Sequence, residues 1–123
     1  MARYLGLAAL LVVALASPTA AAPLNTPKRV LFVGNEKTPR TRAFVELLEM
    51  HFAQVEVADR KTFEPSAAND ADVVLLDWSQ KDAKFPHDPS PLGKREAWKK
   101  PTVFLGSAGL LVAVQWQIIG GSG

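Results

Sequence analysis

The chain has 123 residues, a formal net charge of +2 and no cysteine. This length allows at most one ordinary domain, and the absence of cysteine excludes disulfides, thiolate metal sites and a cysteine nucleophile. The charge is small and mixed in sign, so no nucleic-acid partner is predicted.

The N-terminal segment has the three parts of a secretory signal peptide. Arg3 precedes a short apolar run, Tyr4–Ala16, and small residues occupy 19–22. The run is shorter than the roughly 20 apolar residues that span a bilayer. We therefore expect residues 1–22 to be a signal peptide for export to the periplasm or the extracellular space, and the only part that meets a membrane. An uncleaved membrane anchor is the alternative.

The next elements are a linker, a strand and a helix. Residues 23–28 contain two prolines and no periodicity, which predicts a linker. The apolar run "RVLFVG" at 29–34 predicts a strand that is buried on both faces. Thr38 suits a helix N-cap and Pro39 a first helical position, and apolar residues then recur at helical spacing, which predicts a helix over 39–51.

Three further strands are predicted. The alternating segment Gln54–Ala58 indicates a strand nearer an edge of the sheet. Any helix within 59–72 is expected to be short, because Pro65 interrupts it. The runs "VVLLDW" (Val73–Trp78) and "TVFLG" (Thr102–Gly106) predict a second doubly buried strand and a fourth strand.

The remaining segments are less regular. Residues 79–101 are polar and proline-rich, with a short helix expected near 93–99. Residues 110–118 alternate like a strand, yet every fourth residue is also apolar. The glycines at 109 and 120–121 suit the two ends of a helix, so we expect a helix here.

Strands that alternate with helices predict a parallel sheet, and right-handed crossovers favour the strand order 2-1-3-4. The expected fold is a flavodoxin-like α/β three-layer sandwich over 29–123. Such folds normally have a fifth strand, so an incomplete domain is expected. The predicted core residues of the central strands are Val33, Leu75, Leu76 and Phe104.

In open parallel sheets, ligands bind beyond the carboxyl ends of the strands, where the strand order reverses. Two predicted helix N-termini would direct backbone N–H groups to this crevice, which favours phosphate or carboxylate. The side chains expected to bind a small polar or anionic ligand there are Asn35, Thr38, Arg40, Asp77 and Ser107.

Two of these residues carry open alternatives. Asp77 ends an apolar strand, where it can be a base, a metal ligand or a phosphate acceptor, or a loop cap that faces water. Arg40 opposes the dipole of its helix, which makes more sense if it meets an anion, either Asp77 or a ligand. Its long side chain can also simply extend into solvent.

Ser107 is not expected to act as a nucleophile. The chain offers only two histidines as bases, His51 and His87, and the turn is not a G-x-S-x-G elbow. Its expected role is to cap the following helix. Asp82, His87 and Asp88 form a weak metal pattern, and we expect neither a metal nor a cofactor. The three tryptophans can stack on a sugar or pack in the core.

Three stretches, "RVLFVGNEKTPRTRAFVELLEMHFAQVEV", "DADVVLLDW" and "PTVFLGSAGLLVAVQWQIIGG", resemble the layout of the class I glutamine amidotransferase-like superfamily, including its ThuA-like branch. Those amidotransferases place a cysteine in a G-x-C-x-G turn. Gly106 matches the first glycine, but Ala108 falls on the cysteine position. ThuA-like proteins also carry histidines near the ends of the first and fourth strands. The corresponding residues here, Gly34-Asn35 and Gly106-Ser107, include no histidine. The resemblance implies a fold without the nucleophile.

Two stretches also resemble response-regulator receiver domains: "VLLDW", with Asp77 at the phosphoacceptor position, and "PTVFLGSA", with its hydroxyl residue Ser107. Gly34-Asn35 replaces the acidic pair that binds magnesium in that family. This resemblance implies shared architecture and not shared activity.

These observations favour an exported domain that binds a small polar or anionic ligand and performs no covalent catalysis itself. One alternative is a ThuA-like or hydrolase-type enzyme whose other catalytic residues lie beyond Gly123. A structural or interaction module of the cell envelope is the other. The sequence does not indicate an oligomeric state.

Overall fold

The computed structural model describes residues 26–84 and 87–118, so the expected signal peptide and the glycines at 120–121 lie outside the described residues. A four-stranded parallel sheet has the order β2-β1-β3-β4, which confirms the predicted flavodoxin-like arrangement. The strands are β1 (Thr26–Gly34), β2 (Phe52–Asp59), β3 (Val73–Trp78) and β4 (Thr102–Gly106). The helices are α1 (Pro39–Glu49), α2 (Ala108–Gln115) and the short 3₁₀ helix η1 (Pro65–Ala68).

The bounds of β3 and β4 are as predicted, whereas some other boundaries shift by a few residues. β1 begins at Thr26 rather than Arg29, so part of the expected linker is strand, and the Thr26 backbone N–H donates to His51 O at 3.0 Å. α1 ends at Glu49, before His51. Gly109 lies within α2 rather than in the turn before it.

The prediction of a short helix near 93–99 is wrong. Gly93 has a φ of +75°, and the carbonyl of Lys94 accepts hydrogen bonds from the backbone N–H groups of both Ala97 and Trp98. The result is one isolated turn. The Trp98 indole then donates to the Thr102 hydroxyl at 2.7 Å, which draws the segment toward the start of β4.

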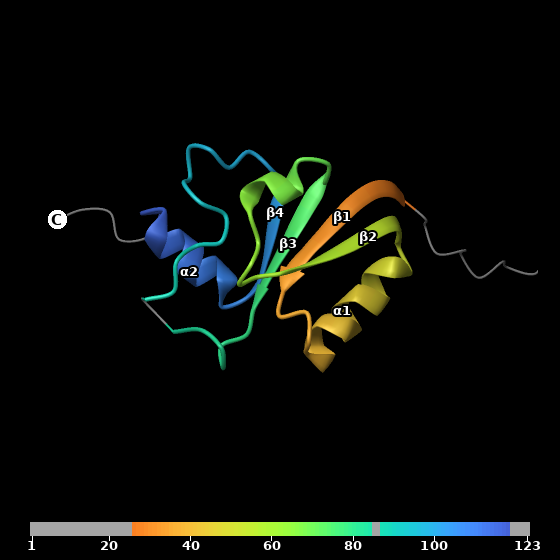
Figure 1. Cartoon of the computed structure of the whole chain (residues 1–123), viewed down its shortest axis with the longest axis horizontal. Coiled ribbons are helices and arrows are strands. Elements are labelled where there is room, and N and C mark those ends of the chain that lie inside the picture. The colour runs from red at the N-terminus through yellow and green to blue at the C-terminus, as the bar shows by residue number, and fades with distance from the viewer. Residues whose placement is uncertain (1–25, 85–86, 119–123) are drawn as a thin grey trace, which may run out of the picture.

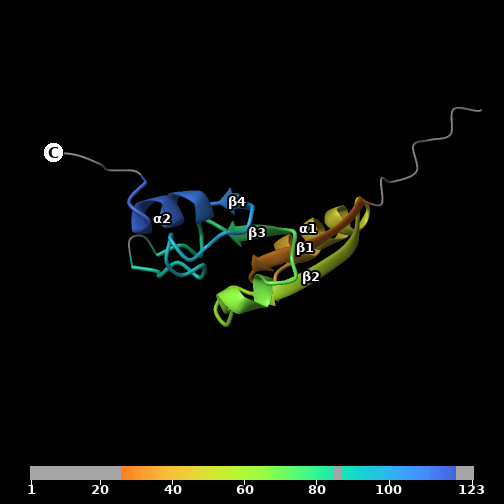
Figure 2. The same ribbon diagram turned by 90° about the horizontal axis from the view of Figure 1, so that it is seen from above.

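The helices cover opposite faces of the sheet (Figure 1). Leu48 of α1 packs with Val30 and Phe32 of β1, whereas Leu111 and Val112 of α2 belong to the cluster on the other face. This follows from right-handed crossovers, because the chain leaves β1 toward β2 and then returns past β1 to β3 and β4. Seen from above, α1 lies along β1 and β2, and α2 lies at the β4 end (Figure 2).

β1 is buried on both faces, as predicted. Val30, Leu31, Phe32 and Val33 are all buried, so β1 is covered on both faces. Leu76 is also fully buried. Leu75 is only half-buried, but it packs against the cluster of Val30, Phe32 and Leu48, so its core prediction is confirmed in part. Phe104 is 38% exposed, so that core prediction is wrong. Within the described residues β4 pairs only with β3, and its outer edge has no neighbouring strand.

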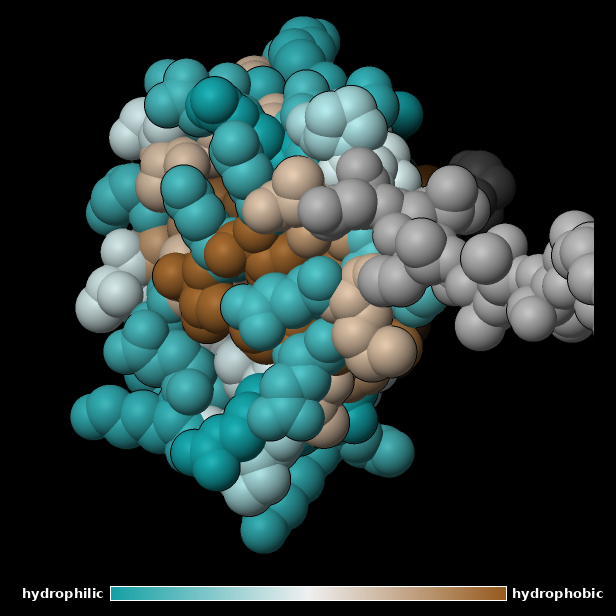
Figure 3. Space-filling model, turned by 90° about the vertical axis from the view of Figure 1, so that its right-hand side faces the viewer, coloured by the Kyte–Doolittle hydropathy of each residue, from teal (hydrophilic) through white to brown (hydrophobic). Residues whose placement is uncertain are grey.

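Apolar side chains are also exposed on α1 and β2, where Leu47 and Val57 are 52% and 39% accessible. Figure 3 shows an apolar area near the middle of the side on which β1, β2 and α1 lie, surrounded by hydrophilic residues. None of the helices in the described part of the chain is long and apolar enough to cross a membrane.

Candidate functional site

The strand order reverses between β1 and β3. The chain leaves β1 toward the α1 face and leaves β3 toward the opposite face, which opens a crevice at the carboxyl ends of the two strands. A pocket of about 210 Å³ occupies this position. Its lining residues are Asn35, Thr38, Arg40, Arg60, Asp77, Ser79, Lys81 and Asp82. The structure therefore brings together every predicted site residue except Ser107.

The loop from β1 to α1 is held by its own hydrogen bonds. The Asn35 carbonyl accepts from the hydroxyls of Thr38, at 2.9 Å, and Thr41, at 2.7 Å. Thr38 has an extended backbone and accepts from the Thr41 N–H, which confirms the predicted N-cap. A Cβ on Gly34 would lie 2.8 Å from the Phe32 ring, so the turn requires glycine. These contacts fix the position of Asn35 at the crevice.

Arg40 and Asp77 form a two-point ion pair across the crevice. Arg40 Nε donates to Asp77 Oδ2 at 2.9 Å, and Nη2 donates to Oδ1 at 2.8 Å. The Asp77 side chain is 5% accessible and that of Arg40 is 43% accessible. The hydrogen bond to Asp77 raises the pKa of Arg40 above its ordinary value, although partial burial opposes this.

This pair decides between the alternatives left open by the sequence. Arg40 meets an anion, and that anion is Asp77. Asp77 is buried and does not face water as a loop cap would. Because Arg40 engages both carboxylate oxygens, any role of Asp77 as a base, metal ligand or phosphate acceptor would first require this pair to break.

The turn after β4 has a different role from the one predicted for it. Ser107 is the N-cap of α2, but its φ of −85° and ψ of 0° are not extended, and its side chain makes no capping bond. Its N–H donates to the Trp78 carbonyl at 2.7 Å. Gly106 has a φ of +63°, and a Cβ there would lie 2.4 Å from the same oxygen. Ala108, the next residue, is fully buried.

Arg60 is a site residue that the sequence reasoning missed. It follows β2 directly, and its backbone N–H donates to Gly34 O at 2.8 Å, which anchors it beside the loop after β1. Its guanidinium lies 4.2 Å from the centre of the Trp78 ring, and Nη1 donates to the Asp77 carbonyl at 3.5 Å. Its place directly after the carboxyl end of a predicted strand is the sequence signal that indicates this role.

Most of the donor capacity of Arg60 is unused. A guanidinium has five N–H groups, and those of Arg60 other than the one on Asp77 have no hydrogen-bond partner among the described residues. Burial lowers the pKa of Arg60, with nearby aspartates, Asp82 first among them, opposing the shift. Arg60 is therefore a half-buried cation that faces the crevice with free donors.

The other candidate groups have local roles. The Ser79 hydroxyl donates to Asp82 at 2.9 Å, and Asp88 accepts from the Lys84 N–H at 2.7 Å. Across residues 26–84 and 87–118, no three His, Asp or Glu side chains gather closely enough to hold a metal ion. Trp78 is buried, and the Trp116 indole donates to Gly93 O at 2.9 Å.

Comparisons of this chain with protein-family models, with curated proteins and with solved structures find no match. The two family resemblances therefore stay predictions.

Proposed function

We propose that this chain is an exported α/β domain that binds a small anionic ligand in the crevice between β1 and β3, without covalent catalysis of its own. The observation that carries the proposal is Arg60, a half-buried cation whose free N–H groups lie at the pocket. These N–H groups are open to solvent at the pocket, and a carboxylate or phosphate would accept charge-assisted hydrogen bonds from them, which are stronger than neutral ones. Lys81 adds a second positive charge to the pocket wall.

Arg40 has a different part in this proposal. Its charge is compensated by Asp77, so it positions the loop after β1 rather than attracting the ligand. Arg60 is the residue that contacts the anion.

The enzyme alternative is less well supported by these residues. Ala108 offers no nucleophile, and Ser107 is not among the residues that line the crevice pocket. A hydrolase-type reaction at this site would need groups supplied from outside the described residues.

Binding is tested by titration calorimetry of the full chain with inorganic phosphate and with acetate. We expect Arg60→Gln to weaken binding about tenfold, equivalent to about 1.4 kcal/mol. Arg42→Gln is the matched control, because Arg42 is exposed on α1 and does not line the pocket. Equal affinities in both variants, or no binding of either anion by the wild-type chain, would contradict the proposal.

Export is tested separately, by expression of the full chain with a C-terminal tag in a bacterial host. We expect a periplasmic protein whose N-terminus begins near residue 22 or 23. Full-length protein that stays in the cytoplasm would contradict the export part of the proposal and leave the binding part unaffected.

A further inference from the structure

A second, larger cavity adjoins the crevice pocket. Its volume is about 750 Å³, and it shares Asn35, Arg60, Lys81 and Asp82 with the smaller pocket. Binding sites for small organic molecules have volumes of about 300–1,000 Å³, so this cavity exceeds the needs of an inorganic anion. A ligand held by Arg60 therefore has room for a further chemical group.

One part of the cavity wall is cationic. Besides Arg60, it contains Lys61 and Lys84, which are both exposed and whose amino groups have no partner among the described residues. The carboxylates in the same lining are Glu64, Asp82 and Asp88, and among the described residues none of them forms an ion pair with Arg60 or with either lysine. This leaves the lysine amino groups and Arg60 available to an anionic ligand.

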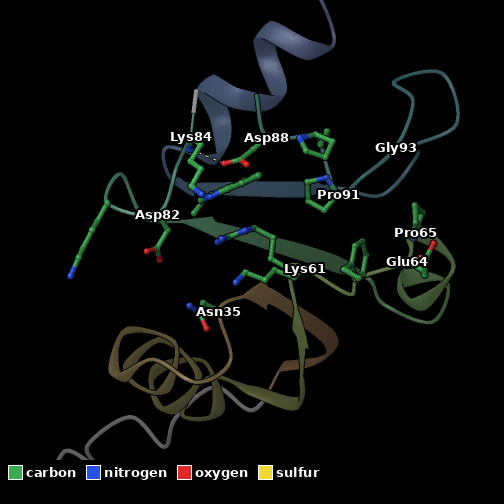
Figure 4. Close-up of a pocket in the computed structure, with 15 residues that line it drawn as sticks. Asn35, Lys61, Glu64, Pro65, Asp82, Lys84, Asp88, Pro91 and Gly93 are labelled. Carbon is green, nitrogen blue, oxygen red and sulfur yellow. Dashed lines mark hydrogen bonds between the residues drawn. The ribbon is translucent and has the colours of Figure 1, made fainter. Parts of the chain in front are cut away.

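Another part of the wall is apolar and rigid. Phe63, Pro65 and Pro91 line it, and Phe63 is buried against Trp98 in an edge-on contact with ring centres 6.4 Å apart. In the close-up, Asn35, Asp82 and Lys84 lie on one side, Pro65 and Glu64 lie on the other, and Pro91 and Lys61 lie between them (Figure 4). Pro65 and Pro91 thus offer apolar surface to a ring, and the exposed Glu64 carboxylate lies on the Pro65 side.

Trp78 supports Arg60 at the cavity wall. The residue is 4% exposed and lines the cavity, and the Arg60 guanidinium lies 4.2 Å from the centre of its ring. Its indole Nε1 has no hydrogen-bond partner among the described residues, but this atom is buried and a molecule in the cavity does not reach it. The ring face of Trp78, and not its N–H group, therefore contributes to the site.

We infer that the larger cavity binds an organic anion, in which a phosphate or carboxylate lies at Arg60, Lys61 and Lys84 and a ring packs against Phe63, Pro65 and Pro91. This inference rests on the proposed function and adds the class of ligand to it. The positive groups supply the attraction for the anion, and the ring gains from burial of apolar area.

The test compares three probes by titration calorimetry on the full chain: phenyl phosphate, inorganic phosphate and phenol. We expect phenyl phosphate to bind at least about tenfold more tightly than inorganic phosphate, and phenol to bind most weakly. Equal binding of the two phosphates would overturn the inference and leave the proposed function standing. If neither phosphate binds, both fail, and if phenol equals phenyl phosphate, the anionic part is wrong.

Variants separate the two parts of the cavity wall. Lys84→Gln should weaken both phosphates by about fivefold, whereas Lys99→Gln, an exposed lysine outside the cavity, should change neither. Phe63→Leu should weaken phenyl phosphate and leave inorganic phosphate unchanged. If Phe63→Leu does not fold, Pro65→Ala makes the same test from an exposed position. Equal losses for both phosphates in these apolar variants would refute the ring contact.

Discussion

Arg40→Gln and Asp77→Asn break one ion pair from opposite ends, and we expect them to cost different amounts of stability. Arg40→Gln leaves the Asp77 carboxylate, whose side chain is only 5% accessible, without its cation. Breaking a fully buried pair costs about 3–5 kcal/mol, and solvent access to the guanidinium side reduces this to about 2–3 kcal/mol. Asp77→Asn leaves a cation that can turn to water and keeps an acceptor of the same shape, so about 1 kcal/mol is expected.

Urea denaturation of both single variants and of the double variant measures these costs and their coupling. The control is Arg42→Gln on the exposed side of α1, which should change the free energy of unfolding by less than about 0.5 kcal/mol. Equal costs for Arg40→Gln and Asp77→Asn, or a larger cost for Asp77→Asn, would refute the argument from unequal burial.

The pKa of Arg40 also predicts how the stability cost of Arg40→Gln depends on pH. The hydrogen bond to Asp77 raises the pKa of Arg40 in the folded protein. The ion pair therefore stabilises the fold fully at every pH below the ordinary arginine pKa, and this contribution is lost only as the pH rises above that value. The cost of Arg40→Gln should therefore be the same at about pH 6 and about pH 8.

Three further outcomes are expected from urea denaturation. Leu76→Ala should cost about 2–5 kcal/mol, because Leu76 is fully buried. Leu75→Ala should cost clearly less, because Leu75 is only half-buried. Thr38→Ala should cost about 1 kcal/mol for the lost cap, whereas Ser107→Ala, which loses no capping bond, should cost less than about 0.5 kcal/mol. Gly106→Ala should cost more than about 1–2 kcal/mol for two reasons. The φ of Gly106 is positive, and an added Cβ would lie 2.4 Å from the Trp78 carbonyl oxygen of β3. A cost below about 0.5 kcal/mol for Gly106→Ala would show that the turn relaxes freely.

The strands and their order were predictable because they depend on local signals. A continuous apolar run such as Val30–Val33 indicates a strand that is buried on both faces of a sheet. The right-handedness of the crossover connections then limits the possible strand orders. Burial of a particular side chain depends instead on what covers it. Leu75 and Phe104 have the same local pattern as buried residues, yet the sheet around β4 is incompletely covered in the described structure.

The candidate site was predictable in place but not in composition. Strand ends meet at one edge of a parallel sheet, so Asn35 and Asp77 were expected to be neighbours. The contribution of Arg60 depends on its stacking on Trp78 and on its distance from Asp77, which are tertiary contacts. Ser107 has the right residue type for a cap, but its backbone conformation, which the sequence does not specify, prevents the bond.

The central position of β1 has a consequence for biosynthesis. β1 is made before β2 and β3, the two strands that pair with it. Until Val73–Trp78 has left the ribosome, the apolar, β-branched segment Val30–Val33 has an unpaired edge and no complete core around it. Such segments associate with other chains when they stay exposed. Pairing with β3 therefore removes the last open edge of β1 at which another chain could add.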